Sequence, residues 1–279
     1  MGKQILIIGA GKSATVLIEY LQKKALQNGW YIVLADANGK TAAQKWNNAP
    51  NGESIELHVE SAQERTRWIQ KADIVISMMP ASLHFLIAKD CLQLGKPLFT
   101  ASYVDDQMKS LAEEIKEKKL LFICEMGLDP GIDHMSAMEL IDRIQAKKGK
   151  ITGFKSHCGG LIAPESDNNP WHYKISWNPR NIILAGQAGA VYLEDSESKS
   201  KIYQQIFENA QEIDVPHIGK LSYYPNRDSL TYIETYALQG IQHFVRTTLR
   251  HPDFCVGWNA IVQLGLTSET HLSTQFNTI

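Results

Sequence analysis

The chain has 279 residues, of which 44% are hydrophobic and 21% charged, and its formal net charge is −2. This length allows one large domain or two ordinary ones, each with its own core. The charge argues against binding to nucleic acid through a general basic field. No apolar run reaches the roughly 18 residues that a membrane-spanning helix needs, so we expect no membrane association.

The four cysteines, Cys91, Cys124, Cys158 and Cys255, are widely spaced and form no C-x-x-C pair. This spacing argues against a zinc site or a disulfide framework and is typical of a reducing compartment. We therefore expect no bound metal and a cytoplasmic location.

The first half of the chain alternates short apolar segments with amphipathic ones. Strands are expected at 4–8, 31–35, 55–59, 73–78, 97–100 and 120–124, and helices at 13–24, 41–48, 62–71, 83–94 and 105–118. Strands that alternate with helices in this way form parallel sheets with right-handed crossovers. The pattern predicts an α/β fold, a Rossmann-type doubly wound parallel sheet.

The second half has a different pattern. Strand-like segments are expected at 151–160, 172–177, 181–186, 190–195, 231–238 and 243–250, and helices near 203–210 and 255–266. This order predicts an α+β domain with a mixed or mostly antiparallel sheet. We place a dinucleotide-binding domain at 1–127 and a substrate-binding domain at 128–279.

The first expected strand runs into the segment GAGKSA, in which Gly9, Gly11 and Ala14 fit G-x-G-x-x-[GA]. The first glycine permits a tight turn, the second lets backbone approach a pyrophosphate, and Ala14 allows close packing of helix on strand. The N–H groups around Lys12 and Ser13 would then point at the anion. This context predicts a dinucleotide site.

Asp36 ends the second expected strand, where a carboxylate accepts from the ribose hydroxyls of a dinucleotide. An acid here favours NAD over NADP, because a 2′-phosphate would meet a like charge. Lys40 is a counterweight that keeps NADP open, and a simple turn role for Asp36 is the alternative. The ends of the fourth and fifth expected strands, with Met79 and Pro80 and with Thr100 and Ala101, are expected to border the same ligand.

The segment GLDPG, residues 127–131, follows the sixth expected strand. In one interpretation Asp129 caps a helix that Pro130 begins, and the glycines only ease the turn. In the other, Asp129 also faces the nicotinamide, and Gly127 and Gly131 leave room for a substrate. In the second half, Arg227 and Arg250 could bind substrate carboxylates as bidentate forks or pair with structural acids.

With these residues in view, the chain resembles the saccharopine reductases, also called saccharopine dehydrogenases (L-glutamate-forming). The matching segments are GAGKSA, TASY, GLDPGIDHM, HCGGLIAPESDNNPWHYKISWNPR, YPNRDS and RTTLRHPDFC. The resemblance implies an NAD- or NADP-dependent oxidoreductase of lysine metabolism that acts on saccharopine. It also implies substrate-binding roles for Ser102, Tyr103, Asp129, Arg227, Thr248 and Arg250.

Members of this family usually continue beyond the point that corresponds to Ile279, so the chain is expected to be a short relative or a fragment. Asp129 is the first choice for the base that the reaction needs. His134 and His157 are competitors, and packing is the expected role of His134. A nucleophilic pair of His157 and Cys158 is not expected, because neighbours on a strand point to opposite faces.

Two rival functions remain open at this stage. One is a related imine reductase of polyamine synthesis, resembling carboxynorspermidine dehydrogenase, although the two arginines favour an acidic substrate. The other is a dinucleotide-binding protein without catalysis. The sequence also leaves open whether the chain forms a homodimer.

Overall fold

The structure is a computed structural model that describes residues 2–175 and 180–268. The chain divides into two compact units, Met1–Met135 and Ser136–Ile279. Each unit has its own sheet and its own hydrophobic clusters, so the two are described separately.

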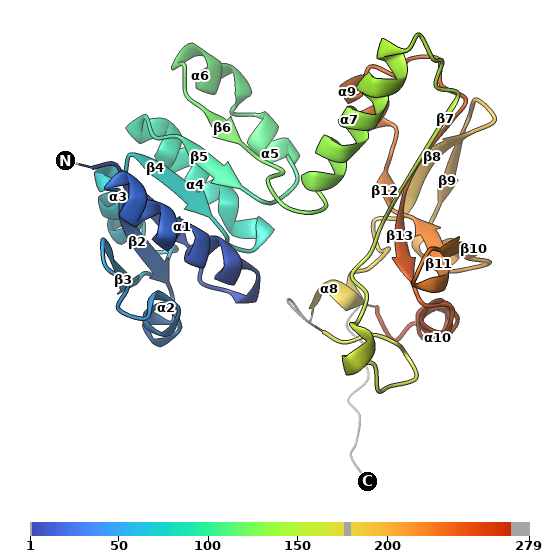
Figure 1. Ribbon diagram of the computed structural model, residues 1–279, viewed down its shortest axis with the longest axis horizontal. Coiled ribbons are helices and arrows are strands. Elements are labelled where there is room, and N and C mark those ends of the chain that lie inside the picture. Colours follow the sequence, from blue (N-terminus) through green and yellow to red (C-terminus); the bar gives the residue numbers. More distant parts are fainter. Residues whose placement is uncertain (1, 176–179, 269–279) are drawn as a thin grey trace. The chain divides into compact units, whose positions relative to one another are not determined.

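The first unit is built on a six-stranded parallel sheet in the order β3-β2-β1-β4-β5-β6 (Figure 1). Its strands are β1 (Gln4–Ile8), β2 (Tyr31–Asp36), β3 (Gly52–Glu56), β4 (Ile74–Ser77), β5 (Leu98–Thr100) and β6 (Phe122–Ile123). The connecting helices are η1 (Lys12–Ala14), α1 (Thr15–Asn28), α2 (Gly39–Trp46), α3 (Ala62–Lys71), α4 (Ala81–Leu94), α5 (Asp106–Lys109) and α6 (Ala112–Glu117). The predicted doubly wound α/β fold is confirmed.

The inner strands of this sheet are covered by helices on both faces, which explains why β1 and β2 are apolar along most of their length rather than alternating. Along β1, Ile5 and Ile7 pack with α1 and α2, while Leu6 and Ile8 pack with α3 and α4. The carboxyl ends of parallel strands therefore share one edge, and the loops that follow β1, β2, β4 and β5 lie along it.

Some element bounds in this unit differ from the sequence prediction. A 3₁₀ turn, η1, precedes α1, and β3 begins at Gly52 rather than at residue 55. The helix expected at 105–118 is interrupted between α5 and α6. Bounds set by backbone hydrogen bonding are the least predictable feature of such patterns.

The second unit contains a seven-stranded mixed sheet in the order β10-β11-β13-β8-β12, with β7 paired to β13 and β9 paired to β8. The strands are β7 (Gly153–Cys158), β8 (Ala190–Glu194), β9 (Glu197–Lys201), β10 (Gln211–Val215), β11 (Gly219–Pro225), β12 (Arg227–Asp228) and β13 (His243–Arg250). The helices are α7 (Ile132–Ala146), which spans the division between the units, η2 (Pro164–Ser166), α8 (Arg180–Ile183), η3 (Tyr203–Gln205), α9 (Thr231–Thr235) and α10 (Pro252–Gln263). The predicted α+β fold with a mixed sheet is confirmed.

Three expected strands of this half are wrong or lie partly outside the described residues. Residues 181–186 and 231–238 contain the helices α8 and α9 instead. Residues 172–175 form no strand, and 176–177 lie outside the described residues. The helix expected near 203–210 is reduced to the 3₁₀ turn η3.

Candidate functional site

The turn after β1 has the geometry that a tight glycine turn requires. Gly9 has φ of +107°, and a Cβ there would lie 2.8 Å from the Met78 carbonyl oxygen after β4. A Cβ on Gly11 would meet no atom within 4 Å, so open space lies beside the backbone at this position. The turn therefore presents its main chain at the sheet edge, as a pyrophosphate would need.

Asp36 holds this turn together. Its Oδ2 accepts from the N–H of Ala10 at 2.7 Å, and its Oδ1 accepts from the N–H of Asn38 at 2.8 Å. The carboxylate is thus fixed at the end of β2, beside the glycine turn. Each carboxylate oxygen has a second lone pair and can still accept from another donor.

A cation that the sequence analysis did not single out, Lys45, contacts this turn. Lys45 Nζ donates to the Gly11 carbonyl oxygen and to Thr15 Oγ1, the latter at 2.8 Å. Lys40 is exposed near the start of α2. The sequence missed Lys45 because only the packing of α2 brings this side chain to the turn.

The other expected cofactor-binding residues lie along the same sheet edge. Lys12, Ser13 and Ala14 form η1, and the Ala14 side chain is fully buried against β1. Met79 and Pro80 connect β4 to α4, while Thr100 ends β5 and Ala101 follows it. Their cofactor contacts remain predictions.

The segments TASY and GLDPG meet within the first unit. The Tyr103 hydroxyl donates to Asp129 Oδ1 at 2.6 Å. The helix α7 begins only at Ile132, two residues after Pro130. The simple reading of Asp129 as a cap with Pro130 as the first helical residue is therefore wrong.

The two glycines of GLDPG close the loop on itself. A Cβ on Gly131, where φ is +150°, would lie 2.1 Å from the Gly127 carbonyl oxygen. The Gly127 N–H also donates to the Pro130 carbonyl oxygen at 2.9 Å. Gly131 is thus required by close backbone packing, a reason different from the substrate space that the sequence suggested.

An acidic pair surrounds His134 at the start of α7. His134 Nε2 lies 3.1 Å from Glu125 Oε2, and His134 Nδ1 lies 3.8 Å from Asp133 Oδ2. Glu125 Oε1 also accepts from the Val104 N–H at 3.1 Å. These contacts connect the residues after β6 with α7 and with the segment after TASY, and packing stays the predicted role of His134.

A buried histidine that the sequence missed connects two of the strand ends. His84, in the first turns of α4, contacts Ser77 Oγ through Nδ1 and Ser102 Oγ through Nε2, each at 2.8 Å. Ser77 ends β4 and Ser102 follows β5. The signal in the sequence was weak, because a lone histidine in an amphipathic helix is common.

In the second unit, Arg250 ends β13. Its guanidinium lies 5.3 Å from the Tyr173 ring centroid and 5.5 Å from that of Phe254. One terminal nitrogen donates to the Leu249 carbonyl oxygen at 2.9 Å. The buried Nε donates to no acceptor among the described residues. A buried charged donor without an acceptor is costly, so this atom is suited to an anionic ligand.

The register of β11 and β13 relates Arg250 to the backbone that leads into Arg227. Arg250 is opposite Ser222, whereas the Asn226 N–H, next to Arg227, donates to the Arg246 carbonyl oxygen. The rise from Arg246 to Arg250 is about 13 Å along the strand. The backbone next to Arg227 thus lies beside the Arg246 end of this stretch rather than beside Arg250, and carboxylate binding by the two side chains stays a prediction.

Thr248 and Arg250 share one face of β13, because alternate residues of a strand point the same way. His157, on β7, contacts Thr247 Oγ1 through Nδ1 at 2.6 Å and so belongs to the opposite face. Burial lowers the pKa of the His157 imidazole, and the nearby Lys155 lowers it further.

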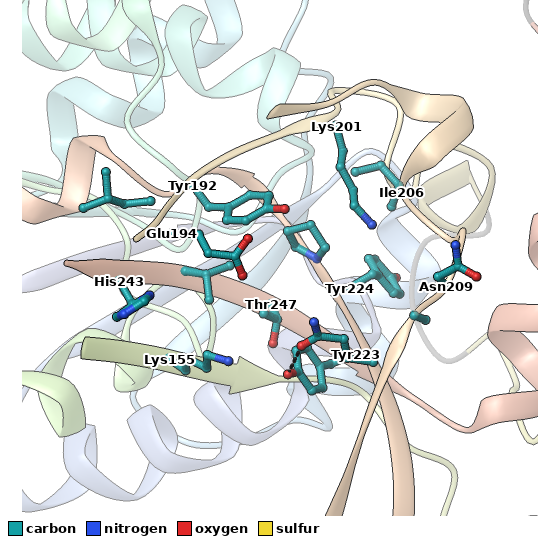
Figure 2. A pocket seen from close by; sticks show the side chains of 15 residues that line it. Lys155, Tyr192, Glu194, Lys201, Ile206, Asn209, Tyr223, Tyr224, His243 and Thr247 are labelled. Atoms are coloured by element: carbon teal, nitrogen blue, oxygen red, sulfur yellow. Dashed lines mark hydrogen bonds between the residues drawn. The ribbon is translucent and has the colours of Figure 1, made fainter. Parts of the chain in front are cut away.

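A cavity of about 110 Å³ lies on that opposite face. Figure 2 shows the residues that line it, which include Lys155, Lys201, Glu194 and Thr247. None of the three substrate-binding residues expected in this unit, Arg227, Thr248 and Arg250, lines the cavity. The sequence did not predict it, since its walls come from strands that are separated along the chain.

Within residues 2–175 and 180–268, no group of three or more His, Cys, Asp or Glu side chains is placed to hold a metal ion. In the same residues, no helix is long and apolar enough to cross a membrane.

Comparisons with known proteins agree with this architecture. The family profile "Saccharopine dehydrogenase NADP binding domain" matches residues 5–123, and "Saccharopine dehydrogenase C-terminal domain" matches residues 127–278. An alpha-aminoadipic semialdehyde synthase of Arabidopsis thaliana is 34% identical over 94% of this chain and 26% of its own length. A saccharopine dehydrogenase [NADP(+), L-glutamate-forming] of Schizosaccharomyces pombe is 33% identical over 95% of this chain and 58% of its own length.

A solved structure is also similar. Apo saccharopine dehydrogenase (L-Glu forming) from Saccharomyces cerevisiae superposes with a TM-score of 0.85 at 29% identity, covering 96% of this chain and 59% of the other. This chain thus spans less than two thirds of the length of these relatives. Because the two profiles together match nearly all of it, the chain belongs to the saccharopine dehydrogenase family.

Proposed function

We propose that this chain uses NAD to interconvert saccharopine with L-glutamate and 2-aminoadipate semialdehyde. The observation that carries the proposal is the Arg250 guanidinium, whose buried Nε has no acceptor among the described residues. An ionised carboxylate is the acceptor that an arginine binds best. The names of similar proteins, which specify L-glutamate-forming saccharopine dehydrogenases, support this choice of substrate.

The first unit would hold the dinucleotide. Gly11, Lys12 and Ser13 lie where a pyrophosphate would approach the turn, and Asp36 is fixed at the end of β2, where ribose hydroxyls could donate to it. When bound, the nicotinamide ring accepts or donates the hydride. Asp36 would repel a 2′-phosphate, so we propose NAD, although the family profile and the fungal relative are named for NADP.

The substrate carries a secondary amine between amino-acid groups. Loss of a hydride from the adjacent carbon, with loss of the amine proton, gives an imine that water hydrolyses. A base must accept that proton and then assist the water. Asp129 is the proposed base, because the Tyr103 hydroxyl holds its carboxylate by donating to Oδ1.

In the second unit, Arg227, Thr248 and Arg250 would bind the substrate carboxylates. Arg227 begins β12 and Arg250 ends β13, so the two arginines come from different strands and could bind different acidic groups of one ligand. Such binding would position the reacting carbon, which supplies much of the rate in reactions of this kind.

The test follows the reduced-nicotinamide absorbance after saccharopine and NAD are added to the purified chain. An increase is expected, and in Arg250→Gln the KM for saccharopine should rise by about 10- to 100-fold, the effect of one charge-assisted hydrogen bond. Arg143→Gln, at an exposed position on α7, is the matched control and should leave KM unchanged.

Two results would contradict the proposal. No absorbance change with saccharopine, although NAD binds, would leave only a dinucleotide-binding protein. Turnover with an unaltered KM in Arg250→Gln would remove this arginine from the substrate site.

A further inference from the structure

His84 is a buried titratable group that the proposed reaction does not use. Only 5% of this residue is exposed, and both ring nitrogens contact a serine hydroxyl at 2.8 Å. Ser77 Oγ, on the Nδ1 side, is fully buried at the end of β4. Ser102 Oγ, on the Nε2 side, belongs to the half-buried TASY segment.

The environment favours a neutral ring. Burial lowers the pKa of the His84 imidazole, and the Asp105 carboxylate offsets only part of that effect. A neutral imidazole has one N–H donor and one acceptor nitrogen, whereas each serine hydroxyl can donate or accept. The three groups therefore form a series of hydrogen bonds in which every donor points the same way, and the tautomer of His84 decides which way that is.

The direction decides what Ser102 can offer to a ligand. When Nε2 carries the proton, it donates to Ser102 Oγ, Ser77 donates to Nδ1, and the Ser102 hydroxyl hydrogen is left to donate elsewhere. In the other tautomer, the Ser102 hydroxyl donates its hydrogen to Nε2 and can then only accept a hydrogen bond from a ligand. An ionised carboxylate accepts and cannot donate, so it requires the first arrangement.

The Ser102 end of this hydrogen-bond series lies next to the predicted reaction groups. Ser102 precedes Tyr103, whose hydroxyl donates to Asp129 Oδ1 at 2.6 Å. The Ser102 carbonyl oxygen also accepts from the Glu125 N–H at 3.0 Å, which fixes the backbone of the segment. The side chain of Ser102 is then the adjustable part, and His84 controls it.

We propose that His84 is a positioning residue that, as the Nε2–H tautomer, makes the Ser102 hydroxyl a hydrogen-bond donor to a substrate carboxylate. This inference rests on the proposed function for the identity of the substrate. It adds to that function a preference of the first unit for ligands with an ionised carboxylate, set by the hydrogen-bond relay Ser77–His84–Ser102.

Two substitutions separate the two ends of the relay. The amide nitrogen of Gln in His84→Gln reaches about as far as Nε2 and can still donate to Ser102. The shorter side chain of His84→Asn reaches about as far as Nδ1, so it keeps a contact with Ser77 and loses Ser102. If His84 had a purely structural role, the two variants would have equal kinetics, or their kinetics would differ only as far as their stabilities differ.

The expected result is a difference in KM. His84→Asn should raise the KM for saccharopine about tenfold with a smaller change in kcat, whereas His84→Gln should stay within about threefold of the parent. In a Ser102→Ala background, His84→Asn should have no further effect on KM. Equal KM values in the two variants, or full additivity with Ser102→Ala, would overturn the proposal.

A second measurement needs no turnover. Nitrogen-15 spectra of histidine-labelled protein report which ring nitrogen of His84 carries the proton. Ser102→Ala should shift His84 toward the Nδ1–H tautomer and Ser77→Ala toward the Nε2–H tautomer. Shifts in these directions without saccharopine turnover would support the relay while the proposed function fails, and unchanged spectra would overturn the relay in either case.

Discussion

At the scale of single residues, Asp36 has two roles that a single substitution can remove together. It accepts from the Ala10 and Asn38 N–H groups, which shapes the turn, and it is proposed to accept from the ribose. Loss of its charge and loss of its acceptor atoms must therefore be separated.

Asp36→Ala is expected to weaken the binding of NAD by about 10- to 100-fold, because hydrogen bonds to a charged acceptor are lost. Asp36→Asn keeps an acceptor for the Ala10 N–H and removes the negative charge that opposes a 2′-phosphate. The difference in affinity between NAD and NADP should therefore become smaller, while the turn after β1 keeps most of its structure. Dissociation constants for both dinucleotides, measured by calorimetry, test this; an unchanged NAD affinity in Asp36→Ala would exclude the ribose role.

Single residues also mark where prediction from sequence stops. Gly9 and Asp36 could be found because a local strand–turn–helix pattern fixes their place. His84 and Lys45 could not, since each reaches its partners only after helices pack on the sheet. The aromatic surroundings of the Arg250 guanidinium are likewise a tertiary feature.

At the scale of elements, the first sheet was predictable because strand and helix patterns alternate regularly. The segment 231–238 was not, because its β-branched and aromatic residues are typical of strands. In the structure Tyr232 and Ile233 of α9 and the following Tyr236 pack in one cluster, and Tyr236 is buried against Phe244. A short apolar segment does not distinguish a strand from a helix until its packing partner is known.

The packing of α3 on α4 includes a buried ion pair that gives an element-scale prediction. Arg65 Nε lies 2.7 Å from Asp90 Oδ2, and both side chains are nearly inaccessible to solvent. Asp90→Ala leaves the arginine charge buried without this partner, so the free energy of unfolding should fall by about 3–5 kcal/mol. Urea denaturation measures the change.

The matched control is Lys109→Ala, which removes an exposed pair with Asp106 at 3.7 Å. Exposed pairs of this kind contribute little, so the change should stay below about 1 kcal/mol. If the two substitutions cost the same, the Arg65–Asp90 pair would not be buried in solution.

At the scale of the whole molecule, the two units have separate hydrophobic clusters. The clusters around β1 and β2 draw on α1 to α5, and those of the second unit draw on α7 to α10. The change from one pattern to the other was visible in the sequence, because a parallel α/β rhythm gives way to strands with turn signals.

Separate clusters predict that a ligand of the first unit stabilises mainly that unit. NAD at about 100 times its dissociation constant should add about 2.7 kcal/mol to the opening free energy of the segments that bind it. Amide hydrogen exchange should then slow in β1, β2 and β4 and stay unchanged in β11 and β13, because cooperative units open independently. Asp36→Ala at the same NAD concentration is the control and should lose much of the added protection. An equal gain of protection in β13 would show instead that the two units unfold as one.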